Sequence, residues 1–135
     1  DRANMILLKN PDSRISFRHN NISELANKTD NHYDYAILTY VIHEVNEEER
    51  LALLTGISDV TDKIIIGDYI VPRPEGFGGF ISELIEFIAG REHYRNYKSY
   101  MAAGGVHSLA KKAGLKIIGE IENHSFSNHI VILTK

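Results

Sequence analysis

Apolar blocks alternate with polar and charged blocks along this chain and predict strands and helices in turn. Residues 35–41 are mostly apolar without strict alternation, as expected for a parallel strand that is covered on both faces. Asn46 followed by Glu49 is a capping-box pattern, which places a helix over residues 47–60. Residues 63–69 form a second apolar run of strand length with a polar tip. We therefore expect a series of strand–helix repeats.

Three further segments carry local patterns of the same kind. Residues 3–9 have a helical pattern that stops before Pro11, because proline restricts the residue that precedes it. Residues 14–18 alternate apolar and polar side chains, which predicts a short strand. Apolar residues spaced along one face of segment 80–88 predict a helix that Gly90 can end.

The end of the chain predicts a hairpin. Residues 106–113 suit a short helix that Gly114 ends, and residues 115–121 and 129–134 are runs of strand length. Only residues 122–128 join these two strands, whereas a parallel crossover needs a dozen or more residues. The strands must therefore pair antiparallel if they are neighbours. The predicted fold class is α/β, with a mainly parallel Rossmann-like sheet that closes on a C-terminal antiparallel hairpin.

The composition is that of one globular domain. The chain has 135 residues, of which 43% are hydrophobic and 24% charged, enough to bury a core. The net charge of -3 and the scattered cations argue against nucleic acid as a partner, and no apolar run suits a membrane helix. The absence of cysteine excludes thiolate chemistry and favours a cytoplasmic protein. Since the first residue is not Met, we expect residues 1–135 to be the C-terminal part of a longer domain.

Two titratable side chains follow the predicted parallel strands. His43 comes after residues 35–41, and Asp68 lies at the end of residues 63–69. Ligands of open α/β sheets bind at the carboxyl ends of the strands, so we expect these two side chains to lie close together there. An imidazole titrates near neutral pH, so His43 suits a base that takes a proton from a substrate, and Asp68 suits a group that orients it. The alternative is a histidine that packs on the next helix and an aspartate that caps a loop.

An aromatic segment is the candidate wall of a substrate pocket. Rings with polar tips line small-molecule pockets but also pack half-buried at surfaces, so both interpretations stay open. The candidates are His93, Tyr94, Tyr97 and Tyr100. A metal site is not expected, because no two histidines have the i, i+4 spacing of a helical zinc site and His124 and His129 flank a hairpin loop.

In their order along the chain, these motifs resemble the class I S-adenosylmethionine-dependent methyltransferases. The segments that carry the resemblance are residues 17–22, 34–45, 64–69 and 104–115. They look like the end of the family's third strand, its fourth strand and loop, its fifth strand, and the Gly-Gly and Ala-Gly-Leu stretch before its sixth strand. The resemblance covers nearly the whole chain. The family's first strand with its glycine-rich loop, and most of the second strand, have no counterpart in this sequence.

The resemblance implies S-adenosylmethionine as the cofactor. Asn21 and Ile22 would lie at the adenine, and Thr39 and Tyr40 would contact the cofactor largely through their backbone. An asparagine replaces the family's usual acid at the adenine, and its amide oxygen can still accept from an exocyclic amine. The implied activity is methyl transfer to a small-molecule acceptor. His43 and Asp68 are then the catalytic candidates, and the substrate-binding candidates are His93, Tyr94 and Tyr97.

Two other functional hypotheses remain. One is a non-catalytic methyltransferase-like fragment or interaction module that binds no cofactor, because the glycine-rich loop is absent. The other is a dehydrogenase, which the predicted hairpin and the lack of a GxGxxG motif disfavour.

The strand of residues 35–41 poses a pairing problem. In the family's strand order, 3-2-1-4-5-7-6, this strand would border the absent first strand. An unpaired apolar edge is an aggregation hazard. We therefore expect the edge to be paired by preceding residues, by a second copy in a homodimer, or by residues 14–18.

Overall fold

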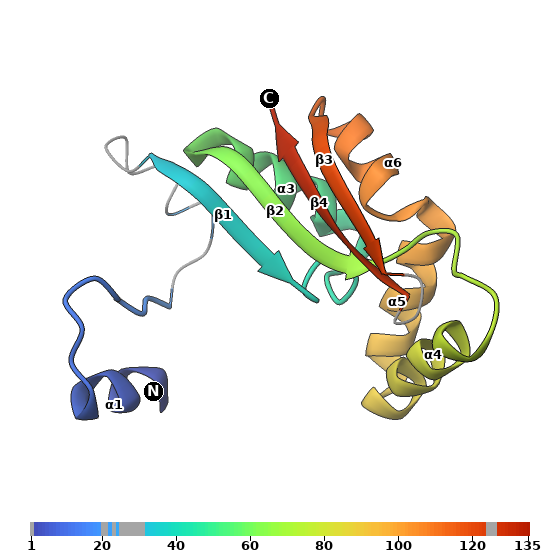
Figure 1. Cartoon of the computed structure of the whole chain (residues 1–135), viewed down its shortest axis with the longest axis horizontal. Helices are drawn as coiled ribbons and strands as arrows, with labels where there is room; N and C mark the ends of the chain where they lie inside the picture. The colour runs from blue at the N-terminus through green and yellow to red at the C-terminus, as the bar shows by residue number, and fades with distance from the viewer. Residues whose placement is uncertain (1, 20–21, 23, 25–31, 124–126) are drawn as a thin grey trace.

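The computed structural model describes residues 2–19, 22, 24, 32–123 and 127–135. The described part of the chain contains a four-stranded sheet with the strand order β1-β2-β4-β3 (Figure 1). The strands are β1 (Tyr33–Thr39), β2 (Thr61–Tyr69), β3 (Lys116–Asn123) and β4 (Asn128–Thr134). The helices are α1 (Arg2–Lys9), α3 (Glu47–Val60), α4 (Phe77–Ala89), α5 (Arg91–Ala103) and α6 (Gly105–Lys112).

The sheet is parallel at one side and antiparallel at the other. β1 pairs parallel with β2, and β4 lies antiparallel between β2 and β3. The predicted C-terminal hairpin is therefore confirmed. The observed order also corresponds to strands 4-5-7-6 of the family that the sequence resembles. Thr39 pairs with Gly67 and Asp68 with His129, so the carboxyl ends of β1 and β2 meet at one edge of the sheet.

The helix α3 has the predicted bounds but not the predicted cap. It spans Glu47–Val60 after Asn46, whose side chain makes no capping hydrogen bond. The backbone N–H of Glu49 donates to the carbonyl oxygen of Asn46 at 2.9 Å instead. The three acidic residues of the first turn still suit the positive end of the helix dipole.

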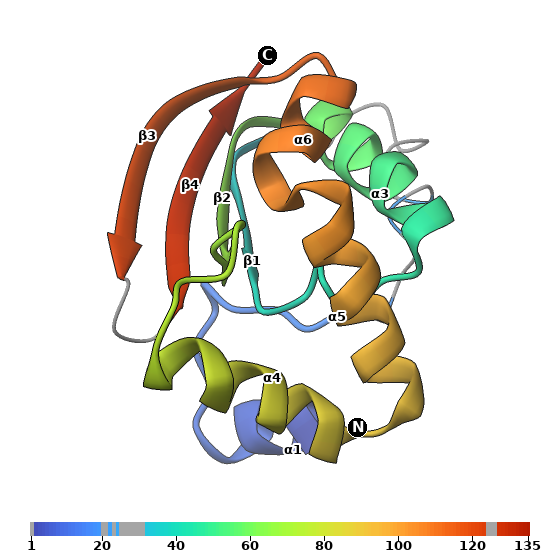
Figure 2. The same ribbon diagram turned by 90° about the vertical axis from the view of Figure 1, so that its right-hand side faces the viewer.

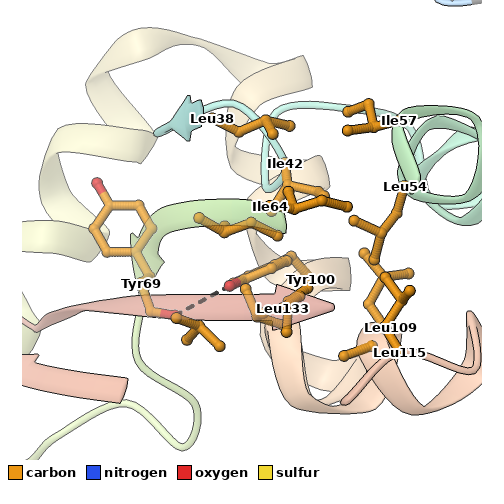
Figure 3. Close-up of a cluster of buried hydrophobic side chains, with 14 of the residues drawn as sticks. Leu38, Ile42, Leu54, Ile57, Ile64, Tyr69, Tyr100, Leu109, Leu115 and Leu133 are labelled. Atoms are coloured by element: carbon orange, nitrogen blue, oxygen red, sulfur yellow. Dashed lines mark hydrogen bonds between the residues drawn. The ribbon is translucent and has the colours of Figure 1, made fainter. Parts of the chain in front are cut away.

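The core lies between the sheet and the layer of α3, α5 and α6 on one of its faces (Figures 2 and 3). Ile66, Val131 and Leu133 point inward from the strands and are fully buried. They meet Leu54 from α3 and Tyr100 from α5. Each such side chain contributes roughly 1.5–3 kcal/mol when it leaves water, so this layer holds the sheet and the helices together.

The described residues leave the opposite face of the sheet uncovered (Figure 2). The prediction that residues 35–41 are covered on both faces is therefore wrong for the described part of the chain. Only Leu38 of β1 is buried, whereas Tyr35 and Ile37 are 55% and 69% exposed. Alternate side chains of a strand point to opposite faces, so a helix layer on one face covers only every second residue. Among the described residues, β1 pairs only with β2.

The predicted strand over residues 14–18 is also wrong. Residues 15–19 have no regular secondary structure, and Arg14 bonds to Asp12 through its backbone and its side chain, both at 2.9 Å. A strand needs a partner, and no described segment supplies one here. Residues 14–18 therefore do not pair with β1. The preceding α1, predicted for residues 3–9, buries no side chain (Figure 1).

The predicted helix of segment 80–88 is confirmed as α4, which Gly90 ends. Its apolar face points outward, since Phe80 and Ile88 are 60% and 74% exposed. Ser82 and Glu86 on its opposite face are buried instead. None of the helices in the described ranges is long and apolar enough to span a membrane.

Candidate functional site

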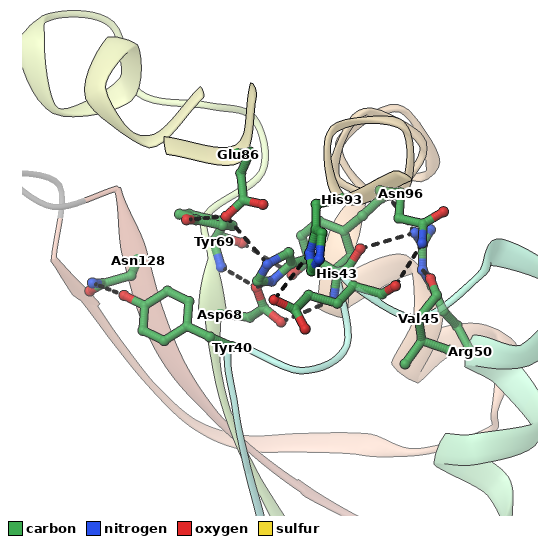
Figure 4. Close-up of polar contacts among 12 residues, drawn as sticks. Tyr40, His43, Val45, Arg50, Asp68, Tyr69, Glu86, His93, Asn96 and Asn128 are labelled. Carbon is green, nitrogen blue, oxygen red and sulfur yellow. Dashed lines mark hydrogen bonds and ion pairs between the residues drawn. The ribbon is translucent and has the colours of Figure 1, made fainter. Parts of the chain in front are cut away.

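His43 and Asp68 lie side by side at the carboxyl ends of β1 and β2, as predicted (Figure 4). The two chain segments that carry them are adjacent because β1 and β2 pair in parallel register. His43 Nδ1 lies 2.6 Å from Asp68 Oδ1, and both side chains are buried. The rule that polar strand ends of a parallel sheet converge therefore holds here.

Asp68 accepts hydrogen bonds from three directions. Its Oδ1 accepts from the backbone N–H of Tyr69 at 2.8 Å, and its Oδ2 accepts from the backbone N–H of His43 at 3.3 Å. An ionised carboxylate has no proton to donate, so the neutral His43 ring places its proton on Nδ1 and donates it to Asp68. The lone pair of His43 Nε2 then points away from Asp68. This is the tautomer that a general base requires.

Glu86 of α4 faces that second nitrogen. Its Oε1 lies 3.5 Å from His43 Nε2 and accepts the hydroxyl hydrogen of Tyr69 at 2.7 Å (Figure 4). These contacts explain why the polar side of α4 is turned inward. Neither Glu86 nor Tyr69 was among the site residues expected from the sequence. The available signal was an acidic residue within an otherwise apolar helix, one turn after Ser82 on the same side.

The charges around His43 raise its pKa above the ordinary value. Burial by itself lowers the pKa of this imidazole, because it disfavours the charged form. The hydrogen bond and charge of Asp68, together with the charges of Glu86 and Glu44, outweigh burial. The pKa of Tyr69 is also raised, by burial and by its hydrogen bond to Glu86, so its hydroxyl stays protonated.

A cavity of about 460 Å³ opens beside this cluster. His43, Tyr69 and Glu86 form its polar side, and Phe77, Ile81 and Ile85 of α4 are among its apolar wall residues. At its rim, the side-chain amide of Asn128 donates to the hydroxyl of Tyr40 at 2.6 Å. An apolar cavity of this size with a few polar groups suits a small organic molecule.

Arg50 of α3 fixes the loop that carries His43 (Figure 4). Its Nε donates to the carbonyl of Val45 at 2.9 Å, and its Nη2 donates to that of Asn96 at 2.6 Å. Asn96 in turn donates from its side chain to the carbonyl of Glu44 at 2.7 Å. The loop between β1 and α3 is thereby bound to both α3 and α5, which keeps His43 in place.

The candidate wall residues of α5 lie outside this cavity. Tyr97 is 1% exposed and packs behind the site, with its ring centroid 5.2 Å from that of Tyr69, and burial raises the pKa of Tyr97 to about 12. The Tyr100 hydroxyl donates to the carbonyl of Tyr69 at 3.1 Å. His93 Nδ1 lies 3.5 Å from a carboxylate oxygen of Glu44, at a separate surface depression. The structure therefore uses these two tyrosines to pack around His43.

The fourth candidate, Tyr94, belongs to a hydrogen-bond network at the surface. The hydroxyl of Tyr94 donates to Glu83 of α4 at 2.9 Å, and Lys98 also bonds to Glu83 at 3.0 Å. The hydrogen bond from Lys98 lowers the pKa of Glu83 most, and the hydrogen bond from Tyr94 lowers it further. Tyr94 thus joins α5 to α4 and contributes to the cavity only through the placement of α4.

The residues expected at the cofactor are only partly grouped. Thr39 and Tyr40 are exposed at the end of β1, and Tyr40 adopts a φ of 53° while its N–H donates to the carbonyl of Gly67 at 2.8 Å. The side chain of Ile22 packs on α3 instead, where a methyl group at Gly56 would lie 3.4 Å from it. Asn21 lies outside the described residues.

Solved structures show which fold this is. The mitomycin 7-O-methyltransferase MmcR matches with a TM-score of 0.67 and 12% identity over 98% of this chain. TnmH matches with a TM-score of 0.60 and 19% identity over 88% of the chain. The magnesium protoporphyrin IX methyltransferase ChlM from Synechocystis, with bound SAH, matches with a TM-score of 0.57 and 13% identity over 99% of the chain. No protein-family model and no curated protein matches the sequence.

This chain corresponds to part of each of those proteins. It spans 38% of MmcR, 34% of TnmH and 57% of ChlM. The described residues therefore have the fold of the C-terminal part of the class I S-adenosylmethionine-dependent methyltransferases, as the resemblance in sequence predicted.

Proposed function

We propose that the protein transfers a methyl group from S-adenosylmethionine to a hydroxyl group of a small molecule. The observation that supports this most is the buried His43–Asp68 pair at the carboxyl edge of β1 and β2, beside an apolar cavity. The fold is compatible with the same class of reaction, since MmcR and ChlM, two of the proteins that match it, are methyltransferases. The hydroxyl acceptor is inferred from the base: an oxygen nucleophile carries a proton that must leave.

The residues present fit the cofactor in part. Thr39 and Tyr40 are exposed at the strand end where the resemblance places backbone contacts to the adenosine. The sequence has no glycine-rich loop for the methionine part, so we expect full affinity only in the full-length protein. When bound, S-adenosylmethionine supplies an electrophilic methyl group. The contribution of this chain is to align the acceptor and to manage its proton.

In the proposed mechanism, the acceptor hydroxyl lies at His43 Nε2. This nitrogen takes the hydroxyl proton that the acceptor oxygen loses when it accepts the methyl group. Asp68 keeps the opposite nitrogen protonated and stabilises the imidazolium that forms. In this structure, a carboxylate oxygen of Glu86 lies 3.5 Å from His43 Nε2, and His43 is 1% exposed. Glu86 must therefore turn aside, or α4 must shift, before the hydroxyl reaches the base. Tyr69 and the walls of the cavity exclude water from that position.

The test is methyl transfer from labelled S-adenosylmethionine to a panel of small phenols and alcohols by the full-length protein. His43→Gln should lower kcat by on the order of 100-fold or more, the usual contribution of a general base, without weakening cofactor binding. His32→Ala is the matched control, because that histidine is 59% exposed in a surface pair with Asp62. Cofactor binding without any methyl transfer, or equal kcat for both variants, would refute the proposed role of His43.

A second candidate is a non-catalytic methyltransferase-like module. The outward apolar face of α4, with Phe80 and Ile88 60% and 74% exposed, favours a role in binding another protein. Calorimetric titration with S-adenosylmethionine separates the two candidates. A module of this kind would show no binding even in the full-length protein.

A further inference from the structure

Three potential metal ligands from three separate elements converge at the β3 side of the sheet. They are His107 of α6, Glu120 of β3 and His129 of β4, and one ligand atom from each lies within 4.8 Å of the others. Glu120 Oε1 lies 2.7 Å from His129 Nδ1, and Glu120 Oε2 lies 2.9 Å from His107 Nε2. None of the three is among the residues that line the cavity at His43.

The hairpin register places two of these side chains on the same face. His129 and Val131 are both buried, because alternate residues of β4 face the helix layer. Glu120 pairs with Val131 after the register shift between Ile117 and Gly119, so it lies on that same face, two residue pairs along from His129. Such irregularities commonly redirect a side chain. The helix α6 packs beside β3 (Figure 1), and its His107 reaches Glu120.

The cluster differs from an ordinary surface ion pair by the burial of His129. The His129 side chain is 1% exposed, and its Nε2 is buried without a hydrogen-bond partner among the described residues. Buried polar atoms in native proteins are nearly always paired. The pair formed by His32 and Asp62 has a similar distance of 2.7 Å, but its side chains are 59% and 62% exposed. That nitrogen points away from Glu120, which faces Nδ1 of the same ring, so the burial of His129 is what distinguishes this cluster from an exposed pair.

The donor set and its dimensions suit zinc. Two imidazole nitrogens and one carboxylate oxygen are the three protein ligands of many zinc sites that keep a fourth position for water. Ligands at 2.0–2.1 Å from a tetrahedral zinc lie about 3.3 Å apart. The two histidine–carboxylate separations of 2.7 and 2.9 Å are those of hydrogen bonds and would widen by about 0.5 Å around such an ion, and the two histidine nitrogens, which lie within 4.8 Å of each other, would come to about 3.3 Å.

We propose that His107, Glu120 and His129 bind a divalent transition-metal ion, with zinc favoured by the ligand set. Water completes the coordination, because the side chains of His107 and Glu120 are 43% and 24% exposed and open the site to solvent. The ion joins α6 to the C-terminal hairpin. The expectation of no metal site rested on helical histidine pairs and on the His124/His129 pair, and sequence spacing does not detect ligands that meet across three elements. This proposal does not depend on methyl transfer.

The test is calorimetric titration of the full-length protein with Zn²⁺ after chelator treatment. We expect one equivalent to bind at this cluster. Replacing the partner of a metal ligand costs roughly 10–100-fold in affinity, so loss of a direct ligand in His107→Ala or Glu120→Gln should cost about 100-fold or more. Both side chains are partly exposed, so these variants should fold. A far-UV circular dichroism spectrum equal to that of the native protein verifies this.

His32→Ala is the matched control and should leave zinc affinity unchanged. Co²⁺ provides an independent readout, because a tetrahedral site with these ligands gives intense visible absorption that His107→Ala should abolish. Two results would overturn the proposal: no stoichiometric zinc binding by the native protein, or affinities of His107→Ala and Glu120→Gln equal to that of His32→Ala. The three residues would then be a hydrogen-bonded cluster only.

Discussion

Arg50→Met tests whether the buried guanidinium fixes the loop of His43. Methionine keeps most of the volume of the arginine stem but removes its donors. The change eliminates the hydrogen bonds to the carbonyls of Val45 and Asn96, at 2.9 and 2.6 Å. The third contact, to the carbonyl of His43, is long at 3.4 Å and counts for little. Each hydrogen bond to a charged group contributes roughly 1.5–3 kcal/mol.

Two features make the expected loss of stability smaller than the sum of these two hydrogen bonds. Burial lowers the pKa of Arg50, which means that the folded protein already opposes its charge. The carbonyl of Asn96 also keeps a second donor, the hydroxyl of Ser99 at 3.0 Å. Only the carbonyl of Val45 then loses its side-chain partner. We therefore expect the free energy of unfolding to fall by about 2–3 kcal/mol, less than the roughly 3–6 kcal/mol of two undiminished charged hydrogen bonds.

The assay is urea unfolding of the full-length protein, followed by circular dichroism. Arg95→Met is the matched control, since it removes the same charge from α5, where Arg95 is 71% exposed and lies 3.8 Å from Glu92. The control should change stability by less than about 0.5 kcal/mol. If Arg50→Met lies within that same range, the loop is held by other contacts and the reasoning fails.

Three further predictions concern stability. In urea unfolding, Gly105→Ala should lower the free energy of unfolding by about 2 kcal/mol more than Gly114→Ala does. Both glycines have a positive φ, of 61° and 71°, but only at Gly105 would an added Cβ meet Val71, at 2.6 Å. Because the folded-state pKa of His43 is raised, its stabilising contribution is present below about pH 6.5 and is lost as pH rises through that pKa. His43→Gln should remove this part of the pH dependence of the free energy of unfolding. Tyr100→Phe should lower the free energy of unfolding by about 1 kcal/mol, because its hydroxyl donates a buried hydrogen bond, and an unchanged denaturation midpoint would contradict this.

Some features of this protein follow from its sequence alone. The bounds of α3 were predictable because an N-terminal residue pattern is a local property, even though the Asn46 side chain makes no capping bond. The antiparallel hairpin was predictable because its short connection forbids a parallel crossover. The contact between His43 and Asp68 was predictable because parallel neighbours place their carboxyl ends together. In each case, one rule about chain geometry suffices.

Other features depend on which segments become neighbours, and only the tertiary structure decides them. The sequence shows an apolar face on α4, but the need to pair Glu86 with Tyr69 turns the polar side of the helix inward. Tyr97 has the composition of a pocket wall, yet the packing of α5 on the sheet encloses it in the core.

The same limit explains the strand prediction that failed and the side-chain cluster that the sequence did not indicate. Residues 14–18 have a strand pattern, but a strand forms only where another backbone accepts its hydrogen bonds, and no described segment does so. His107, Glu120 and His129 are far apart in sequence and have no spacing rule in common, so only the hairpin register and the packing of α6 bring them together. Periodicity fixes the local structure of a segment, whereas its partner, its buried face and its shared ligands are set by contacts with distant parts of the chain.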